Sequence, residues 1–380
     1  MILTATCLFG LEKLVGDEVD ALGYKRIETI DGRVTFEAPP EGVAVCNINF
    51  RFAERLYINM GSFYANTFEQ LFQGVKNIPW EQYIGEYDMF PVKGHSIKSK
   101  LFSIPDCQKI IKKAVVTRLE SVYGRKIFPE TGVNYKIEFF ILNDKATLMI
   151  DTSGDGLHKR GYRPEANDAP IRETLAAAMV AISRPRDEVI LVDPCCGSGT
   201  IPIEAALMDM NVAPGINRSF IAETFPAFPK SMWDAARADA RSKQRPPVRK
   251  IFGFDIDENA LQIAAKNAQR AGAEHIIFEN RDVRKFVSPI PEARGTIVCN
   301  PPYGERLMDK ESAYKLYEAM GKAFSANVPN WQLYIISSDT EFQKHFGRRS
   351  DKARKMYNGM IKCELFQFFR KTLDKPKTKC

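Results

Sequence analysis

The chain of 380 residues is long enough for two or three domains with a sizeable buried core. Hydrophobic residues make up 44% of it and charged residues 27%, as in an ordinary globular protein, and no segment reaches the ~18 uninterrupted apolar residues of a membrane span. Acidic residues follow the amino terminus too closely for a secretory signal, so we expect a cytoplasmic protein. The eight cysteines form no C-x-x-C pair and have no histidine partners at zinc spacing, so no metal site is expected.

The net charge of +7 is unevenly distributed along the chain. Residues 93–126 carry nine basic and two acidic side chains, and residues 341–380 carry twelve and four. Basic runs are most often solvated faces. Two of them beside a catalytic motif favour a polyanionic partner, most simply nucleic acid.

Residues 1–64 predict a small α+β unit. We expect a strand at ILTATCL, a helix over GLEKLVGDEVDALGY that ends at Gly23, and a second strand at GRVTFEA. The helix has one apolar face, formed by Leu11, Leu14, Val15, Val19 and Leu22.

Residues 65–155 predict a second α+β unit. Ser103 to Asp106 resemble a capping box that opens a helix ending at Gly124, and VNYKIEFFIL, ND and KATLMIDTS predict a hairpin. Several cations lie off the apolar stripe of this helix: Lys109, Lys112, Lys113 and Arg118. They suit a surface that follows an RNA backbone, and equally a plain solvated face.

Residues 156–170 are polar and contain Gly and Pro, so they predict a linker. Residues 171–380 then predict a doubly wound parallel sheet, because a helix started by Asp168 and Pro170 is followed by strand-like runs that alternate with helices. These runs are EVILVD, KIFGFD, HIIFEN, GTIVCN and WQLYIISS. Asn358-Gly359 between two apolar runs predicts a terminal hairpin with a type I′ turn.

The stretch VDPCCGSGTIPIEAAL follows the first strand of that sheet and opens a helix. Gly197 and Gly199 let the backbone approach a ligand, and the helix start offers free N–H groups. A third glycine at dinucleotide spacing is missing, and Asp193 would repel a pyrophosphate while suiting a cationic amino-acid ligand. We expect Cys195, Ser198 and Thr200 to line this loop as well; a tight turn without a ligand is the alternative.

The second and third strands end in acidic residues. Asp255 is placed to bind a ribose diol and Ile256 to pack on adenine, whereas Asp257 is expected to be a helix N-cap. Asp255 lies 56 residues beyond Gly199 instead of ~20, which an insertion over residues 209–250 would explain. That insertion is either a surface excursion or a contact with RNA.

After the third strand, Asp282 is placed to accept a hydrogen bond from an adenine amino group, beside Val283. A capping role for Asp282 is the alternative. The sequence therefore predicts a site for S-adenosylmethionine, because Asp255 would bind the ribose, Asp282 the adenine and Asp193 the cationic amino-acid end.

The stretch IVCNPPYGER ends the fourth strand. The Asn300 side-chain oxygen and the Pro301 carbonyl can each accept one N–H of an exocyclic amine, which localises its lone pair. Pro301 and Pro302 fix the backbone, and Tyr303 offers a stacking face for a splayed base. A rigid turn without a chemical role is the alternative.

The motifs DPCCGSGT, FDID, RDV and NPPYGER resemble those of class I S-adenosylmethionine-dependent amino-methyltransferases. LHKRGYR and APIRETLAAAM resemble the segment before the glycine loop in THUMP-domain RNA methyltransferases, and the amino-terminal half resembles their ferredoxin-like and THUMP region. The similarity is closest to the amino-terminal half of the bifunctional bacterial 23S rRNA guanine-N2 methyltransferases and covers essentially the whole chain.

The resemblance implies a seven-stranded methyltransferase sheet with an antiparallel last strand. It places Arg172, Glu173 and Thr174 at the methionine end of the donor and residues 158–163 near the site. It also implies methyl transfer to guanine N2 in 23S rRNA, with S-adenosylhomocysteine as product and no obligate protein partner. A tRNA substrate, adenine-N6 methylation and a non-catalytic RNA-binding protein stay open as alternatives.

Overall fold

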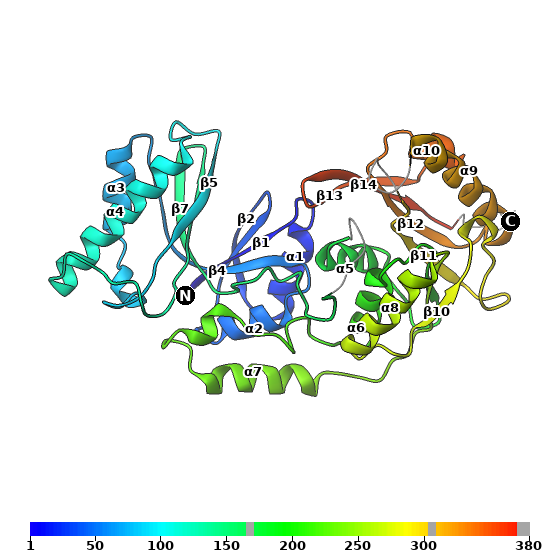
Figure 1. Ribbon diagram of the computed structural model, residues 1–380, viewed down its shortest axis with the longest axis horizontal. Coiled ribbons are helices and arrows are strands. Elements are labelled where there is room, and N and C mark those ends of the chain that lie inside the picture. Colours follow the sequence, from blue (N-terminus) through cyan, green and yellow to red (C-terminus); the bar gives the residue numbers. More distant parts are fainter. Residues whose placement is uncertain (165–170, 303–308, 371–380) are drawn as a thin grey trace, which may run out of the picture. The chain divides into compact units, whose positions relative to one another are not determined.

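The computed structural model describes residues 1–164, 171–302 and 309–370, which form two compact units (Figure 1). Unit 1 consists of Met1–Cys7, Val15–Leu157 and Arg218–Asp239. Unit 2 consists of Leu8–Leu14, His158–Asn217 and the chain from Ala240 onward. Within the described residues, no helix has both the length and the apolar character needed to cross a membrane.

Unit 1 is built on one seven-stranded sheet with the strand order β2-β3-β1-β4-β7-β6-β5. The neighbouring strands are antiparallel except for β5 and β6, which are parallel. The strands are β1 (Ile2–Cys7), β2 (Lys25–Ile30), β3 (Arg33–Glu37), β4 (Ala53–Tyr64), β5 (Val92–Ile97), β6 (Ile137–Leu142) and β7 (Lys145–Asp151). The 12-residue strand β4 pairs with β1 on one side and β7 on the other, so the two predicted α+β units share one sheet.

The helices of this part of the chain are α1 (Glu12–Ala21), α2 (Gly42–Asn49), α3 (Phe68–Lys76) and α4 (Ile104–Tyr123). The expected end of α4 is confirmed, because Gly124 adopts a left-handed φ of 66°. The expected capping box is wrong. The Ser103 hydroxyl donates to the Asp106 carboxylate at 2.6 Å and caps no backbone N–H, and Pro105 in the first turn has no N–H to offer.

The cations of α4 are partly used inside unit 1. Lys112 Nζ lies 2.6 Å from a carboxylate oxygen of Glu130 and 3.6 Å from the ring centroid of Phe90, and Arg118 pairs with Glu81. Lys109 is largely exposed and lies 4.0 Å from Asp106. Because three of the four cations lie within 4.0 Å of an intramolecular carboxylate, this helix presents less free positive charge than the sequence predicted.

Unit 2 contains a second seven-stranded sheet with the order β10-β9-β8-β11-β12-β14-β13. Its strands are β8 (Ile190–Asp193), β9 (Ile251–Asp255), β10 (Ile277–Asn280), β11 (Gly295–Cys299), β12 (Gln332–Ser337), β13 (Lys352–Asn358) and β14 (Ile361–Phe368). The first five strands are parallel, and β14 is inserted antiparallel between β12 and β13. The predicted fold, including the antiparallel last strand, is confirmed.

The principal helices of unit 2 are α5 (Glu173–Ile182), α6 (Thr200–Asp209), α8 (Glu258–Ala271), α9 (Lys310–Asn327) and α10 (Phe342–Phe346). Phe254, Phe286, Phe324 and Phe342 belong to the buried core that the sheet shares with α9 and α10. The N-cap role of Asp257 is confirmed, since its carboxylate accepts the N–H of Asn259 at 2.9 Å. Asp168 and Pro170, the expected start of α5, lie outside the described residues.

The terminal hairpin is confirmed, but its turn is displaced by one residue. Asn358 pairs with Ile361, so Gly359 and Met360 are the two central turn residues. Gly359 has a φ of 63°, and Met360 is not among the residues with positive φ. This is the pattern of a type II′ turn, with glycine in the first central position, instead of the expected type I′.

The middle of the expected insertion belongs to unit 1. It forms a short 3₁₀ segment (Ile221–Thr224) and most of α7 (Lys230–Ser242). The Phe225 ring stacks on Tyr135 at 4.2 Å, and Phe220 stacks on the fully buried Trp233 at 5.4 Å. Residues 218–239 are therefore packed into unit 1 through aromatic contacts and are not a loose surface excursion.

Candidate active site

The glycine loop joins β8 to α6 as the sequence predicted. Gly199 has a φ of 83°, which side chains other than glycine adopt with strain. A Cβ at this position would also lie 3.0 Å from the Cβ of Ala264 in α8. Ser198 is held from the same helix, because Asn267 donates to its carbonyl at 3.1 Å. Both the backbone conformation and the close helix therefore require glycine at 199.

Asp193 ends β8 at the base of this loop and is only 1% exposed. Its carboxylate accepts the N–H of Cys195 at 3.1 Å. Burial, with a smaller contribution from the charge of Asp255, raises the pKa of Asp193 to about 8. The group is consequently mostly protonated at neutral pH, and a cation bound beside it would favour its ionised form.

Asp255 ends β9 and connects that strand to the glycine loop. One carboxylate oxygen accepts the N–H of Gly197 at 2.8 Å, and the other accepts the N–H of Asp257 at 3.0 Å. Each oxygen keeps a lone pair that a hydroxyl group can use. The next side chain, Ile256, is apolar and 62% exposed, so it offers an uncovered hydrophobic face.

Asp282 follows β10 and caps the 3₁₀ segment Val283–Lys285. Its carboxylate accepts the backbone N–H of Arg284 at 2.9 Å and also the guanidinium Nε of that residue at 2.9 Å. Hydrogen bonding from Arg284 lowers the pKa of the Asp282 carboxyl. The capping alternative is thus realised in the structure, and binding of adenine by Asp282 stays a prediction.

The ends of β8, β9 and β11 and the segment after β10 surround one pocket of about 440 Å³. It is lined by Pro194, Cys195, Asp255, Ile256, Arg281, Asp282, Val283, Arg284, Pro302, Ser312, Lys315 and Leu316. Cys195, Asp255, Ile256, Asp282, Val283 and Pro302 are therefore brought together, whereas the other expected site residues among the described parts of the chain do not line this pocket: Asp193, Gly197, Ser198, Gly199, Thr200, Asn300, Pro301 and Thr174. The three α9 residues, Ser312, Lys315 and Leu316, were missed because they belong to an amphipathic helix without a recognisable motif.

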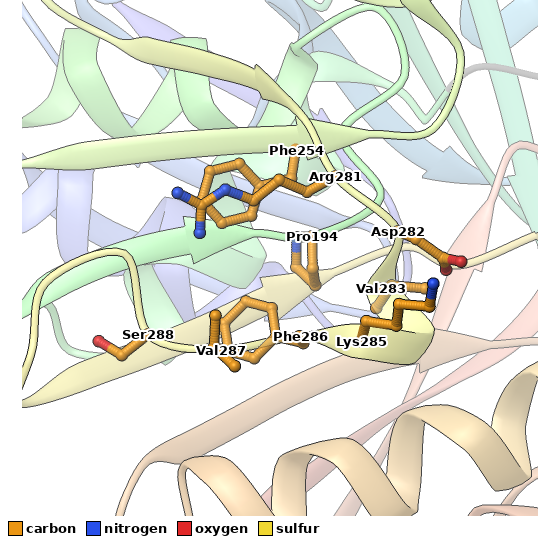
Figure 2. Close-up of a pocket in the computed structure, with 9 residues that line it drawn as sticks. All are labelled: Pro194, Phe254, Arg281, Asp282, Val283, Lys285, Phe286, Val287 and Ser288. Carbon is orange, nitrogen blue, oxygen red and sulfur yellow. The ribbon is translucent and has the colours of Figure 1, made fainter.

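A second hollow of about 380 Å³ adjoins this pocket and shares Pro194, Arg281, Asp282 and Val283 with it. Figure 2 shows the Arg281 side chain beside the Phe254 ring, with Phe286 and Val287 on the opposite side of Pro194. The Arg281 guanidinium lies 4.4 Å from the Phe254 ring centroid and pairs with Glu279 at 2.5 Å. This neighbouring hollow is mainly apolar, and its arginine already has a carboxylate partner.

The Asn-Pro-Pro corner follows β11. The Asn300 side-chain oxygen is buried and has no hydrogen-bond partner in the described parts of the chain. The Pro302 carbonyl accepts a hydrogen bond of 3.1 Å from the hydroxyl of Tyr317, a fully buried residue of α9. Tyr303 lies outside the described residues. A buried acceptor without a donor is costly, so the corner is suited to a ligand that brings an N–H group.

A buried polar cluster lies at the start of α5 and α6. Arg163 donates to the Thr200 hydroxyl at 2.6 Å and pairs with Glu173 at 3.2 Å. Tyr162 donates to Glu204 at 3.0 Å. The segment expected as a linker therefore contributes buried side chains to unit 2, and its residues Tyr162 and Arg163 bind the first two turns of α6.

Two of the residues assigned to the methionine end lie in the first turn of α5. Thr174 is fully buried there. Burial raises the pKa of the neighbouring Glu173, and its Oε2 atom is buried without a hydrogen-bond partner among the described residues. A second buried carboxylate oxygen is thus available near the start of the helix that precedes the glycine loop.

Unit 2 is a doubly wound sheet with an antiparallel strand inserted at one end, and its candidate binding residues follow the carboxyl ends of successive strands. This is the architecture of the class I methyltransferases. Comparison with known families agrees with this class. Residues 160–367 match the RMKL-like methyltransferase domain, residues 2–57 the RlmL ferredoxin-like domain and residues 65–151 the THUMP domain. The chain belongs to the THUMP-containing, RMKL-like S-adenosylmethionine methyltransferases.

Individual relatives extend over nearly the whole chain. It is 42% identical over 374 residues to the putative RNA methyltransferase YpsC of Bacillus subtilis, covering 97% of this chain and 96% of that protein. It is 35% identical over 361 residues to the ribosomal RNA large subunit methyltransferase K/L of Aliivibrio salmonicida, covering 93% of this chain but about half (51%) of that longer protein. The solved structure of SMU.472, a putative methyltransferase complexed with SAH, superimposes with a TM-score of 0.90 at 40% identity and 98% coverage of both chains.

Proposed function

We propose that the chain transfers a methyl group to the exocyclic N2 amino group of a guanine in 23S rRNA. The observation that carries the proposal is the buried side-chain oxygen of Asn300, at the corner after β11, which has no hydrogen-bond partner among the described residues. The corner lies next to the pocket that Pro302 helps to line. The amino-terminal ferredoxin-like and THUMP regions support an RNA substrate.

The exocyclic amine of a nucleobase is a weak nucleophile because its lone pair is delocalised into the ring. The Asn-Pro-Pro corner can raise this nucleophilicity. Asn300 Oδ1 and the Pro301 carbonyl would each accept one N–H of the amine, which localises the lone pair and directs it along one line. No strong general base is needed, because positioning and hydrogen bonding supply most of the rate. Pro301 and Pro302 hold the backbone in place, and the hydrogen bond from Tyr317 to Pro302 fixes it from α9. A stacking role for Tyr303 completes the proposal.

Bound S-adenosylmethionine supplies an electrophilic methyl group carried on a sulfonium. The pocket residues fit this donor: Asp255 would hold the ribose hydroxyls, Ile256 and Val283 would contact adenine, and Asp282 would accept its amino group. The buried carboxyl of Asp193 and the first turn of α5, with Thr174, would face the cationic methionine end. The remaining loop residues, Cys195, Gly197, Ser198, Gly199 and Thr200, would let that end approach the backbone.

The corner selects an exocyclic amine and does not by itself select a base or an RNA. The corner can accept the N–H groups of any aromatic exocyclic amine, so adenine N6 is an alternative base, and a tRNA guanine is an alternative site. The large-subunit relatives favour rRNA. The match covers about half (51%) of that longer relative, and the proposal concerns the one methyltransferase domain matched over residues 160–367.

Mass spectrometry of nucleosides from separated rRNA and tRNA of a strain lacking this gene tests the proposal. We expect N2-methylguanosine to decrease in the large-subunit fraction and to return with the wild-type gene but not with an Asn300→Ala gene. A decrease confined to tRNA would move the substrate and keep the chemistry. A loss of N6-methyladenosine, with N2-methylguanosine intact, would overturn the guanine assignment.

A further inference from the structure

One face of the unit 1 sheet carries mainly polar side chains, although the opposite face is apolar. Along β4, Phe63 contacts Gly74 of α3, whereas the next residue, Tyr64, is 76% exposed. Phe36 of β3 packs on Phe50 at the end of α2, whereas Thr35 lies on the other face with Thr4 of β1. Successive side chains of a strand point to opposite faces of the sheet. The helices therefore pack on the apolar face and leave the polar face uncovered by helices.

The polar face contains a hollow of about 270 Å³. Its lining comes from β1 to β4, in the ferredoxin-like region, and from β6 and β7, in the THUMP region. The shared strand β4 is what brings the two regions together. The hollow is at the small end of ligand sites, which suits one nucleotide better than an extended ligand.

Arg33 is the cation of this hollow. Its guanidinium carbon lies 3.4 Å from the ring centroid of Phe140, and it has neither a hydrogen bond nor an ion pair with any described residue. Burial lowers its pKa to about 10, partly offset by Tyr57 and Glu138 nearby. A partly buried cation that has no ion pair with a described residue favours an anionic ligand.

The other charges lining the hollow neutralise each other, since Lys145 lies 3.8 Å from the Glu28 carboxylate. The remaining polar groups are neutral. Thr4 and Thr35 hydroxyls are 3.0 Å apart, and those of Ser62 and Thr147 are 2.8 Å apart. The hollow thus offers one guanidinium without an ion pair among the described residues, several hydroxyl groups, and an exposed tyrosine ring on the same face. These groups suit one phosphate, its sugar and its base.

We propose that this hollow binds one nucleotide of the RNA substrate, with the phosphate on Arg33 and the base stacked on Tyr64. This nucleotide site depends on the proposed function in one respect, because both take RNA as the substrate. It adds a contact in unit 1 that is separate from the methyl-transfer chemistry. It also makes the ferredoxin-like and THUMP regions one binding element, because neither contributes all of the lining.

Fluorescence anisotropy with a short, labelled single-stranded RNA of mixed sequence, titrated at several salt concentrations, tests this inference. We expect Arg33→Ala in the full chain to weaken binding about tenfold and to flatten the slope of log affinity against log salt by about 0.7, as for one lost phosphate contact. Tyr64→Ala should weaken binding about fivefold without changing the slope. Because Tyr64 is exposed, that variant tests the face even if Arg33→Ala is unstable.

Arg26→Ala is the matched control, because Arg26 lies on β2 in the same sheet and is paired with Asp20 at 2.6 Å. It should bind RNA like the wild type. Wild-type affinity and slope in both Arg33→Ala and Tyr64→Ala would overturn the inference, even if methyl transfer were intact. The inference stands and the proposed function fails if both variants lose RNA affinity while the wild-type chain methylates no RNA fraction.

Discussion

The two seven-stranded sheets of this chain place their polar groups in different ways. In unit 2 the strands that carry the motifs are parallel and nearly continuous apolar runs, and the polar side chains follow at their carboxyl ends. In unit 1 the strands are mostly antiparallel, and polar side chains alternate with buried ones across the sheet. In the parallel sheet a site is formed by short motifs that follow the strand ends. In the antiparallel sheet a site is formed by single side chains from several strands.

This difference predicts that the two regions can be inactivated separately. Substitutions at the strand ends of unit 2 should change donor binding or turnover and leave RNA affinity unchanged. Substitutions on the polar face of unit 1 should do the reverse. The expected effects at the strand ends follow, from the largest to the smallest.

Asn300→Ala should give the largest effect. It removes the buried acceptor of the corner, and we expect kcat to fall about a hundredfold or more, because a preorganised hydrogen bond is lost. Calorimetry should show unchanged donor affinity, and anisotropy unchanged RNA affinity. Turnover within a few-fold of the wild type would exclude the proposed role of Asn300.

The pH dependence of donor binding should report Asp193, whose pKa is about 8 in the unliganded protein. A cationic ligand binds best to the ionised form, so affinity should rise about tenfold per pH unit below pH 8 and level off above it. Asp193→Asn should flatten this profile. A wild-type profile in the variant would show that another group is responsible.

The same carboxyl has a predictable effect on stability. Its pKa is raised from the model-compound value of 3.8, so the folded chain binds more protons than the unfolded chain between these two pKa values. The contribution of Asp193 to the free energy of unfolding should therefore decrease as pH rises from about 4 to about 8. Urea unfolding of Asp193→Asn should lack this component, and an identical pH dependence in both proteins would contradict it.

Gly199→Ala should weaken donor binding about tenfold, because the new Cβ meets Ala264 and the glycine loop must shift. Gly272→Ala is the matched control. Gly272 also has a left-handed φ, of 70°, but open space around its Cβ position. Both variants bear the backbone strain, but only Gly199 lies in the glycine loop, so a lower donor affinity in Gly199→Ala alone would assign the effect to that loop. Equal donor affinities in Gly199→Ala and Gly272→Ala would show that the contact between position 199 and Ala264 does not affect donor binding.

Tyr317→Phe should produce the smallest effect on turnover. It deletes the hydrogen bond to the Pro302 carbonyl, worth about 1 kcal/mol, so kcat should fall about fivefold while donor affinity is retained. Tyr334→Phe is the control, since Tyr334 is equally buried but hydrogen-bonds to Gln332. A fall in thermal stability without a change in kcat would make Tyr317 structural only.

The parallel sheet was largely predictable because its strands are apolar runs of the expected length. One residue or more after each of β8, β9 and β11 lines the same pocket, and the donor-binding roles assigned to them stay predictions. The edge strand β2, by contrast, was missed: its sequence KRIETI has no fully buried residue and therefore no alternating pattern. Local patterns reveal elements that bury apolar groups and overlook those held mainly by backbone hydrogen bonds.

The features that escaped prediction depend on contacts between distant segments. Nothing in the sequence pairs Tyr317 with Pro302, places Arg33 over Phe140, or assigns Lys112 to Glu130. The polar segment before residue 165 was expected as a linker, yet Tyr162 is buried against Glu204. Spacing along the chain carries no information about such pairs, because they are determined by the topology of the sheets.

The aromatic packing of residues 218–239 has a consequence for synthesis of the chain on the ribosome. Unit 1 includes this segment, which follows β8 and α6 of unit 2 in sequence. Until Phe225 has emerged, Tyr135 lacks the ring that stacks on it. The nascent amino-terminal region therefore stays incomplete while the first strand of the catalytic sheet is already made, and its folding cannot be finished domain by domain in chain order.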